Sequence, residues 1–107
     1  MGKRRVVFKL GVTYETDIQQ LKEIPVIITN IIKSIDDTVF DRAHFFSYGD
    51  FSLIFEVVYY VIGSDYNKYM DIQQEINLKI KEEFKKRGIE FAYPTQTLYL
   101  YKMQGGQ

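Results

Sequence analysis

The sequence predicts an α+β domain whose elements follow the order strand, helix, strand, strand, helix, strand, with one additional short strand at the C-terminal end. Three observations lead to this prediction. Several apolar runs alternate with a period of two, two longer segments repeat apolar residues every three or four positions, and a glycine-containing turn joins the second strand to the third. This order is typical of a ferredoxin-like sandwich, in which both helices cover one face of the sheet. Right-handed crossovers would place the first and third strands side by side in the centre of that sheet.

The first strand and first helix are predicted from residues 6–35. Residues 6–14 alternate, so that one face of the strand is apolar. Thr16 and Gln19 have the spacing of a capping box, which predicts that the helix begins here. Pro25 lies inside the helix and is expected to kink it, because proline removes a backbone hydrogen bond. The apolar face of the helix is expected to consist of Ile18, Leu21, Ile24, Ile28, Ile31, Ile32 and Ile35.

The second and third strands are predicted to form a hairpin. Residues 39–47 contain the second strand, and Tyr48-Gly49-Asp50 provides the turn. Residues 52–62 are rich in Val, Tyr, Phe and Ile, which favour strands. Because this run is almost continuously apolar, we expect the third strand to be central and covered on both faces over part of its length.

The second helix is predicted to begin after Gly63-Ser64-Asp65 and to end at Gly88, which fits the residue after a helix C-cap. Residues 89–93 then form the last strand of the core. The buried face of the helix is expected to consist of Tyr69, Ile72, Ile76, Ile80 and Phe84. On the opposite face, i,i+4 ion pairs are expected for Glu75 with Lys79, Glu82 with Lys86, and Glu83 with Arg87.

Composition limits the possible functions. The chain has 107 residues, enough for one core, and its 14 basic and 14 acidic residues cancel. This balance lacks the basic excess that nucleic-acid-binding domains usually carry, so no nucleic acid partner is predicted. There is no cysteine, which excludes disulfides and thiolate chemistry. No apolar run approaches the roughly 20 residues that span a bilayer, and we expect the chain as written to be soluble.

The sequence predicts no catalytic residue, no metal site and no cofactor. His44 is the only histidine and is expected to point to solvent or to a partner. Asp36, Asp37 and Asp41 are interpreted as part of a solvated turn, since the calcium-loop pattern is missing. Phe51 and Phe55 have a shallow similarity to the aromatic strand of an RNA recognition motif, but no basic patch surrounds them. A phosphate cradle is not predicted either, because the loop at residues 15–17 is acidic.

The end of the chain contains a strand with no partner in the predicted sheet. Residues 91–100 read FAYPTQTLYL, so Pro94 separates the last core strand from a second alternating run. An unpaired strand exposes backbone N–H and C=O groups, which proteins usually cover or close into a barrel. We therefore divide the chain into a ferredoxin-like domain at 1–93 and an oligomerisation strand and tail at 94–107. The candidate subunit interface consists of Pro94, Thr97, Leu98, Tyr99, Leu100 and Tyr101.

Three stretches of the chain resemble the cytoplasmic C-terminal part of the small-conductance mechanosensitive channel (MscS) family. They are residues 4–17 (RRVVFKLGVTYETD), 49–57 (GDFSLIFEV) and 88–97 (GIEFAYPTQT). The most specific element is the glycine, isoleucine, phenylalanine, tyrosine and proline pattern within residues 88–94. The resemblance covers about positions 4 to 101.

The resemblance implies a cell-membrane channel that opens under bilayer tension and releases ions and small osmolytes. It also implies a heptamer in which this domain, on the cytoplasmic side, builds the lower wall of a hollow vestibule, while the final strands form a parallel barrel. The chain lacks the transmembrane helices of the family, so we expect a fragment that reaches the membrane only through missing N-terminal segments. The alternative is a free-standing regulatory or small-ligand-binding module of similar topology, which a gene without upstream apolar spans would favour.

Overall fold

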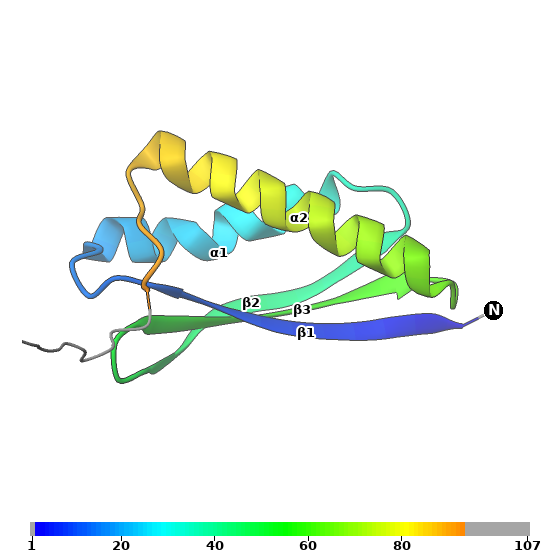
Figure 1. Ribbon diagram of the computed structural model, residues 1–107, viewed down its shortest axis with the longest axis horizontal. Helices are drawn as coiled ribbons and strands as arrows, with labels where there is room; N and C mark the ends of the chain where they lie inside the picture. Colours follow the sequence, from blue (N-terminus) through cyan, green and yellow to red (C-terminus); the bar gives the residue numbers. More distant parts are fainter. Residues whose placement is uncertain (1, 94–107) are drawn as a thin grey trace, which may run out of the picture.

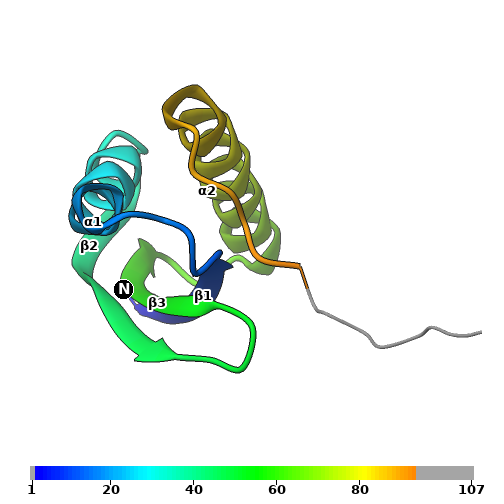
Figure 2. The same ribbon diagram turned by 90° about the vertical axis from the view of Figure 1, so that its left-hand side faces the viewer.

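Three antiparallel strands and two helices make up the part of the chain that the computed structural model describes, which is residues 2–93. Figure 1 shows the two helices lying along the same side of the sheet, and Figure 2 shows both on one face with the opposite face uncovered. The α+β class and the placement of both helices on one face are confirmed. In chain order the elements are β1 (Lys3–Val12), α1 (Ile18–Lys33), β2 (Thr38–Tyr48), β3 (Leu53–Ile62) and α2 (Tyr66–Arg87).

The strands follow the order β1-β3-β2, with β3 antiparallel to both neighbours. The pairing of β1 with β3 is regular along its whole length, from Lys3 opposite Ile62 to Val12 opposite Leu53. The pairing of β2 with β3 shifts register twice, between Phe40 and Arg42 and between Phe45 and Ser47. The predicted neighbourhood of the first and third strands and the central position of the third are therefore confirmed.

The core lies between the sheet and the helices. It is built from side chains of every element, and Val12, Ile24, Phe55, Tyr59 and Phe84 have no exposed surface at all. Burying a large apolar side chain stabilises a fold by about 1.5–3 kcal/mol before entropy is subtracted, so this layer provides most of the driving force. The isoleucines of α1 that enter it are Ile24, Ile27, Ile28, Ile31 and Ile32.

The start of α1 differs from the prediction by one residue. The N-cap is Asp17, whose carboxylate accepts a hydrogen bond from the Gln20 backbone N–H at 2.8 Å. The Gln20 side chain in turn accepts from the Asp17 N–H at 3.2 Å, which completes a capping box. Thr16 is instead buried, with its hydroxyl 3.3 Å from that of Thr13. Ile18 was expected on the apolar face, but as the first residue of the helix it is 68% exposed and does not enter the core, so this part of the prediction is wrong.

Helix α1 continues through Pro25 as one element. Helix α2 begins at the N-cap Asp65 and ends at Gly88, whose φ of 71° is left-handed, as the sequence predicts for this position. Two of the expected ion pairs on α2 are present, from Glu75 to Lys79 and from Glu83 to Arg87. The third is not: Lys86 lies 3.6 Å from Glu83, one residue nearer than the expected Glu82.

The expected fourth strand at residues 89–93 is reduced to a single antiparallel bridge between Val12 and Phe91. Two hydrogen bonds flank it, from the Ala92 N–H to the Gly11 carbonyl at 3.0 Å and from the Thr13 N–H to the Glu90 carbonyl at 3.1 Å. The strand is short because Ile89 is still packed in the core below the end of α2, while Tyr93 is already 82% exposed. The outer edge of β1 is therefore paired only near Val12 within the described residues.

Candidate functional site

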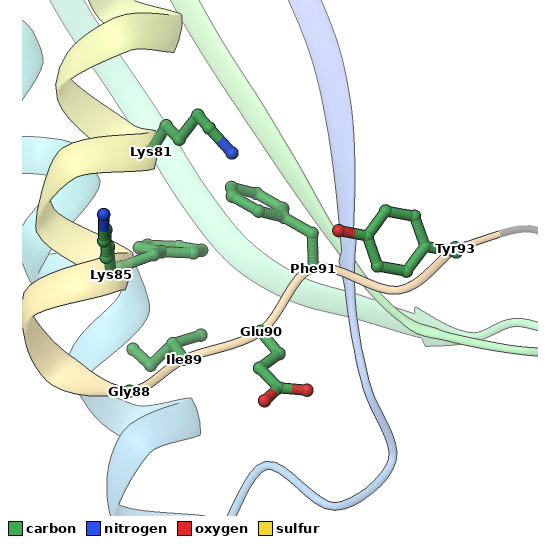
Figure 3. A pocket seen from close by; sticks show the side chains of 8 residues that line it. Lys81, Lys85, Gly88, Ile89, Glu90, Phe91 and Tyr93 are labelled. Atoms are coloured by element: carbon green, nitrogen blue, oxygen red, sulfur yellow. The ribbon is translucent and has the colours of Figure 1, made fainter.

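The chain leaves the sheet where the end of α2 faces β1. Gly88 turns the backbone out of the helix, Ile89 is buried, and the ring of Phe91 stacks on that of Phe84 with centroids 5.0 Å apart. Figure 3 shows a hollow at this point, with Lys81 extending from α2 toward Phe91. Its volume is about 510 Å³, and its lining is formed by Lys81, Phe84, Lys85, Gly88, Ile89, Glu90, Phe91 and Tyr93.

A second hollow of about 250 Å³ adjoins the first and lies between β1 and α2. It shares Lys81 and Phe91 with the first hollow. Its other lining residues come from β1 and the facing side of α2: Phe8, Lys9, Leu10, Asn77 and Ile80. The sequence did not predict this site. A full fourth strand at residues 89–93 would pair with the edge of β1 and leave no hollow beside it.

The predicted interface residues lie outside the described part of the chain. These are Pro94, Thr97, Leu98, Tyr99, Leu100 and Tyr101. The structure describes the approach to them, which ends at the exposed Tyr93 beside the larger hollow. The predicted interface therefore stays a prediction, while its starting point on the fold is defined.

The acidic and histidine residues singled out from the sequence do not converge on one site. His44 lies on β2 and is exposed. Asp37 pairs with Lys68 at 3.0 Å, and Asp41 pairs with Arg42 at 3.2 Å. Within residues 2–93, no group of three or more His, Cys, Asp or Glu side chains could hold a metal ion.

The two phenylalanines that resemble an RNA platform point in different directions. Phe55 has no exposed surface and stacks on Phe45, with ring centroids 5.3 Å apart, on the side of the sheet that the helices cover. Phe51 lies in the turn before β3 and is 54% exposed. Because one ring is inside the core, the pair cannot stack two successive bases.

Tyr59 is the one described residue whose ionisation is strongly perturbed. Burial raises its pKa well above the usual value near 10, and the neighbouring Tyr69 adds to the rise. Its hydroxyl donates a hydrogen bond to the Gln73 side-chain oxygen at 2.6 Å, which links β3 to α2. A tyrosine that stays neutral and hydrogen-bonded in the core has a structural role and offers no nucleophile or base.

No helix within residues 2–93 combines the length and apolar character needed to cross a membrane. Residues 6–91 match the family model described as "Mechanosensitive ion channel MscS, C-terminal". The chain is 45% identical over 101 residues to the small-conductance mechanosensitive channel MscMJ of Methanocaldococcus jannaschii, covering 94% of this chain and 29% of that protein. It is 44% identical to the large-conductance channel MscMJLR of the same organism, over 92% of this chain and 29% of that one.

Among solved structures, the fold is similar to the crystal structure of Helicobacter pylori MscS in its closed state. The TM-score is 0.66 at 19% identity, and the match covers 94% of this chain and 39% of the other. This likeness concerns the fold.

The chain spans less than a third of the length of the two curated relatives, MscMJ and MscMJLR.

Proposed function

The chain belongs to the MscS family of mechanosensitive ion channels, and on that premise we propose that it forms part of the cytoplasmic vestibule wall of such a channel. In this proposal the complete protein opens under membrane tension and releases ions and small osmolytes. The domain itself performs no chemistry. Its role is to build the wall and to hold identical subunits together, as a heptamer by analogy with the family.

The observation that supports this role most directly is the way the chain leaves its own sheet. Continuing the register of the Val12–Phe91 bridge one residue at a time would place Pro94 opposite Lys9. The Ala92 N–H donates to the Gly11 carbonyl, so the next donor toward β1 would have to come from residue 94. Proline has no N–H and cannot supply it. In this proposal, pairing of the tail with β1 in the same register would therefore lack a hydrogen bond at its first step.

We propose that the run at residues 97–101 pairs instead with the same run of neighbouring subunits. An alternating strand that its own sheet does not hold is satisfied when several copies close into a barrel, which leaves no unpaired edge. The position of Tyr93 supports this proposal, since the residue is 82% exposed and forms no bridge with β1.

Light scattering across a concentration series tests the proposal. The 107-residue chain is expected to gain mass with concentration, and a chain that ends at Pro94 is expected to remain a monomer. A matched variant, Leu98→Asp with Leu100→Asp, keeps the length and should also remain monomeric, because two carboxylates would enter the barrel wall. If all three proteins have the same mass at every concentration, the tail does not assemble this domain.

A further inference from the structure

We propose that the outer edge of β1 and the hollow beside it bind an extended acidic segment of a partner protein, which adds to the sheet as its fourth strand. We call this site the β1 groove and define it by Arg5, Val7 and Lys9 at the strand edge together with the side chains of the smaller hollow. The inference goes beyond the proposed assembly, because it concerns a different surface and a different partner.

The backbone of β1 offers a row of donors and acceptors at this edge. The Gly11 carbonyl and the Thr13 N–H point to the outer side, where the carbonyl accepts from the Ala92 N–H and the Thr13 N–H donates to the Glu90 carbonyl. Because N–H and C=O groups of alternate residues point the same way in a strand, those of Arg5, Val7 and Lys9 also face outward. Within residues 2–93 no strand pairs with them. An extended segment can satisfy them by β-augmentation.

The side chains next to this edge form an apolar floor. Phe8, Leu10, Ile80 and Phe91 line the smaller hollow of about 250 Å³, where a full fourth strand would pack below α2. Successive side chains of a strand point to opposite faces, so a bound segment would direct every second residue into this hollow. Those residues should be apolar and of moderate size, such as valine.

The charges around the groove select an acidic segment. Arg5 and Lys9 lie on the uncovered face of the sheet, and Lys81 lies across the hollow on α2. None of the three has an ion-pair partner among the described residues. Lys9 is held over the ring of Phe46 at 4.7 Å, which keeps its ammonium group near the strand. The outward residues of the segment should therefore be Glu or Asp, opposite Arg5 and Lys9.

Two occupants from this chain itself fit less well. The tail at residues 94–107 contains a lysine and no acidic residue, so it does not complement the groove. A second copy pairing through its own β1 edge would bring Arg5 and Lys9 against the same basic side chains, and like charges on paired strands are destabilising. Charge complementarity thus favours a partner of different sequence.

Fluorescence anisotropy with a labelled peptide of sequence EVEVEVE, added to the 107-residue chain at low salt, tests the proposal. We expect it to bind at least about tenfold more tightly than KVKVKVK, which has the same pattern and the opposite charge. Val7→Pro removes an outward N–H without taking a hydrogen bond from the β1–β3 ladder, and it should reduce binding by about tenfold or more. Val7→Thr keeps the N–H and should bind like the parent protein.

Charge reversal provides a test that does not depend on proline being tolerated. Lys9→Glu and Lys81→Glu should each weaken binding of EVEVEVE several-fold. Lys22→Glu, on the exposed side of α1, makes the same change in net charge and should have a much smaller effect, because Lys22 does not line the groove. Equal losses in all three variants, or tighter binding of the tail peptide TQTLYLYKM than of EVEVEVE, would overturn the proposal. Light scattering of the same samples reports tail-mediated assembly independently. Peptide binding does not require that assembly, so either proposal can fail without the other.

Discussion

The ring of Phe91 stacks on the ring of Phe84, with 5.0 Å between centroids and 21° between planes, while the Phe91 backbone bridges Val12. One residue therefore ties the end of the chain both to α2 and to β1. Its neighbour Tyr93 is already exposed, so Phe91 is the last described residue that anchors the segment leading to the tail. This contact therefore fixes where residues 92 and 93 leave the sheet.

Replacing Phe91 with alanine should lower the free energy of unfolding by about 2 kcal/mol, because it removes a stacked ring from a partly buried site. Urea denaturation gives the value. Tyr93→Ala is the matched control, since its ring is 82% exposed and its loss should stay within about 0.5 kcal/mol. Equal destabilisation by the two variants would mean that Phe91 does not anchor the segment.

Gly88 has a φ of 71°, and nothing lies within 4 Å of the position that a Cβ would occupy. The cost of Gly88→Ala is therefore backbone strain without a clash, which amounts to about 1–2 kcal/mol. Gly88→Asn should lose less, because asparagine adopts the left-handed region more readily. Thermal and urea unfolding of the two variants measure the difference, and an alanine variant as stable as the parent would contradict it.

Local signals explain why most of the fold could be predicted. Alternation along β1 and β3, the Gly49 turn and the left-handed Gly88 each depend on residues close in sequence, and each is found where expected. The predicted N-cap of α1 is wrong by one residue, because Thr16 and Asp17 are both residue types that favour this position. Asp17 is the N-cap in the structure, since Thr16 is buried and its hydroxyl lies beside that of Thr13.

The length of the last strand could not be predicted, because it depends on two contacts with residues distant in sequence. One is the packing of Ile89 in the core, and the other is the pairing of Phe91 with Val12. Residues 89–93 have strand-forming character, yet Ile89 is held in the core and only Phe91 reaches β1. The β1 groove exists because the rest of that edge stays unpaired among the described residues. No local pattern in residues 3–12 indicates whether a distant segment will cover them.

Tyr59 should make the domain less stable in alkaline solution. Its pKa is raised in the folded state by burial, whereas in the unfolded chain it is near 10. Below about pH 10 both states keep the proton, so the hydroxyl has no effect on pH dependence. Above this pH the unfolded state loses the proton first, and stability falls as pH rises, by up to about 1.4 kcal/mol per pH unit.

The variant Tyr59→Phe isolates this effect. It removes the hydrogen bond to Gln73 and should cost about 1 kcal/mol at pH 7. Its urea midpoint should then decline less steeply than that of the parent between pH 9 and about pH 11. Tyr93→Phe is a suitable control because Tyr93 is 82% exposed. Parallel declines in the parent and in Tyr59→Phe would show that Tyr59 does not govern alkaline unfolding.

Pro94→Ala should extend the chain's own pairing along β1. An alanine N–H opposite Lys9 could donate to its carbonyl, so the tail would gain the hydrogen bond that proline denies it. Hydrogen exchange at the Val7 and Lys9 amides should slow by about tenfold as the edge becomes occupied. Pairing of the tail with β1 should also weaken binding of EVEVEVE and lower the mass of the assembled chain, because one segment cannot pair in two places.

Thr95→Ala leaves Pro94 intact and should change none of these quantities. Unchanged exchange at Val7 and Lys9 in Pro94→Ala would show that the proline is not what separates the tail from the sheet.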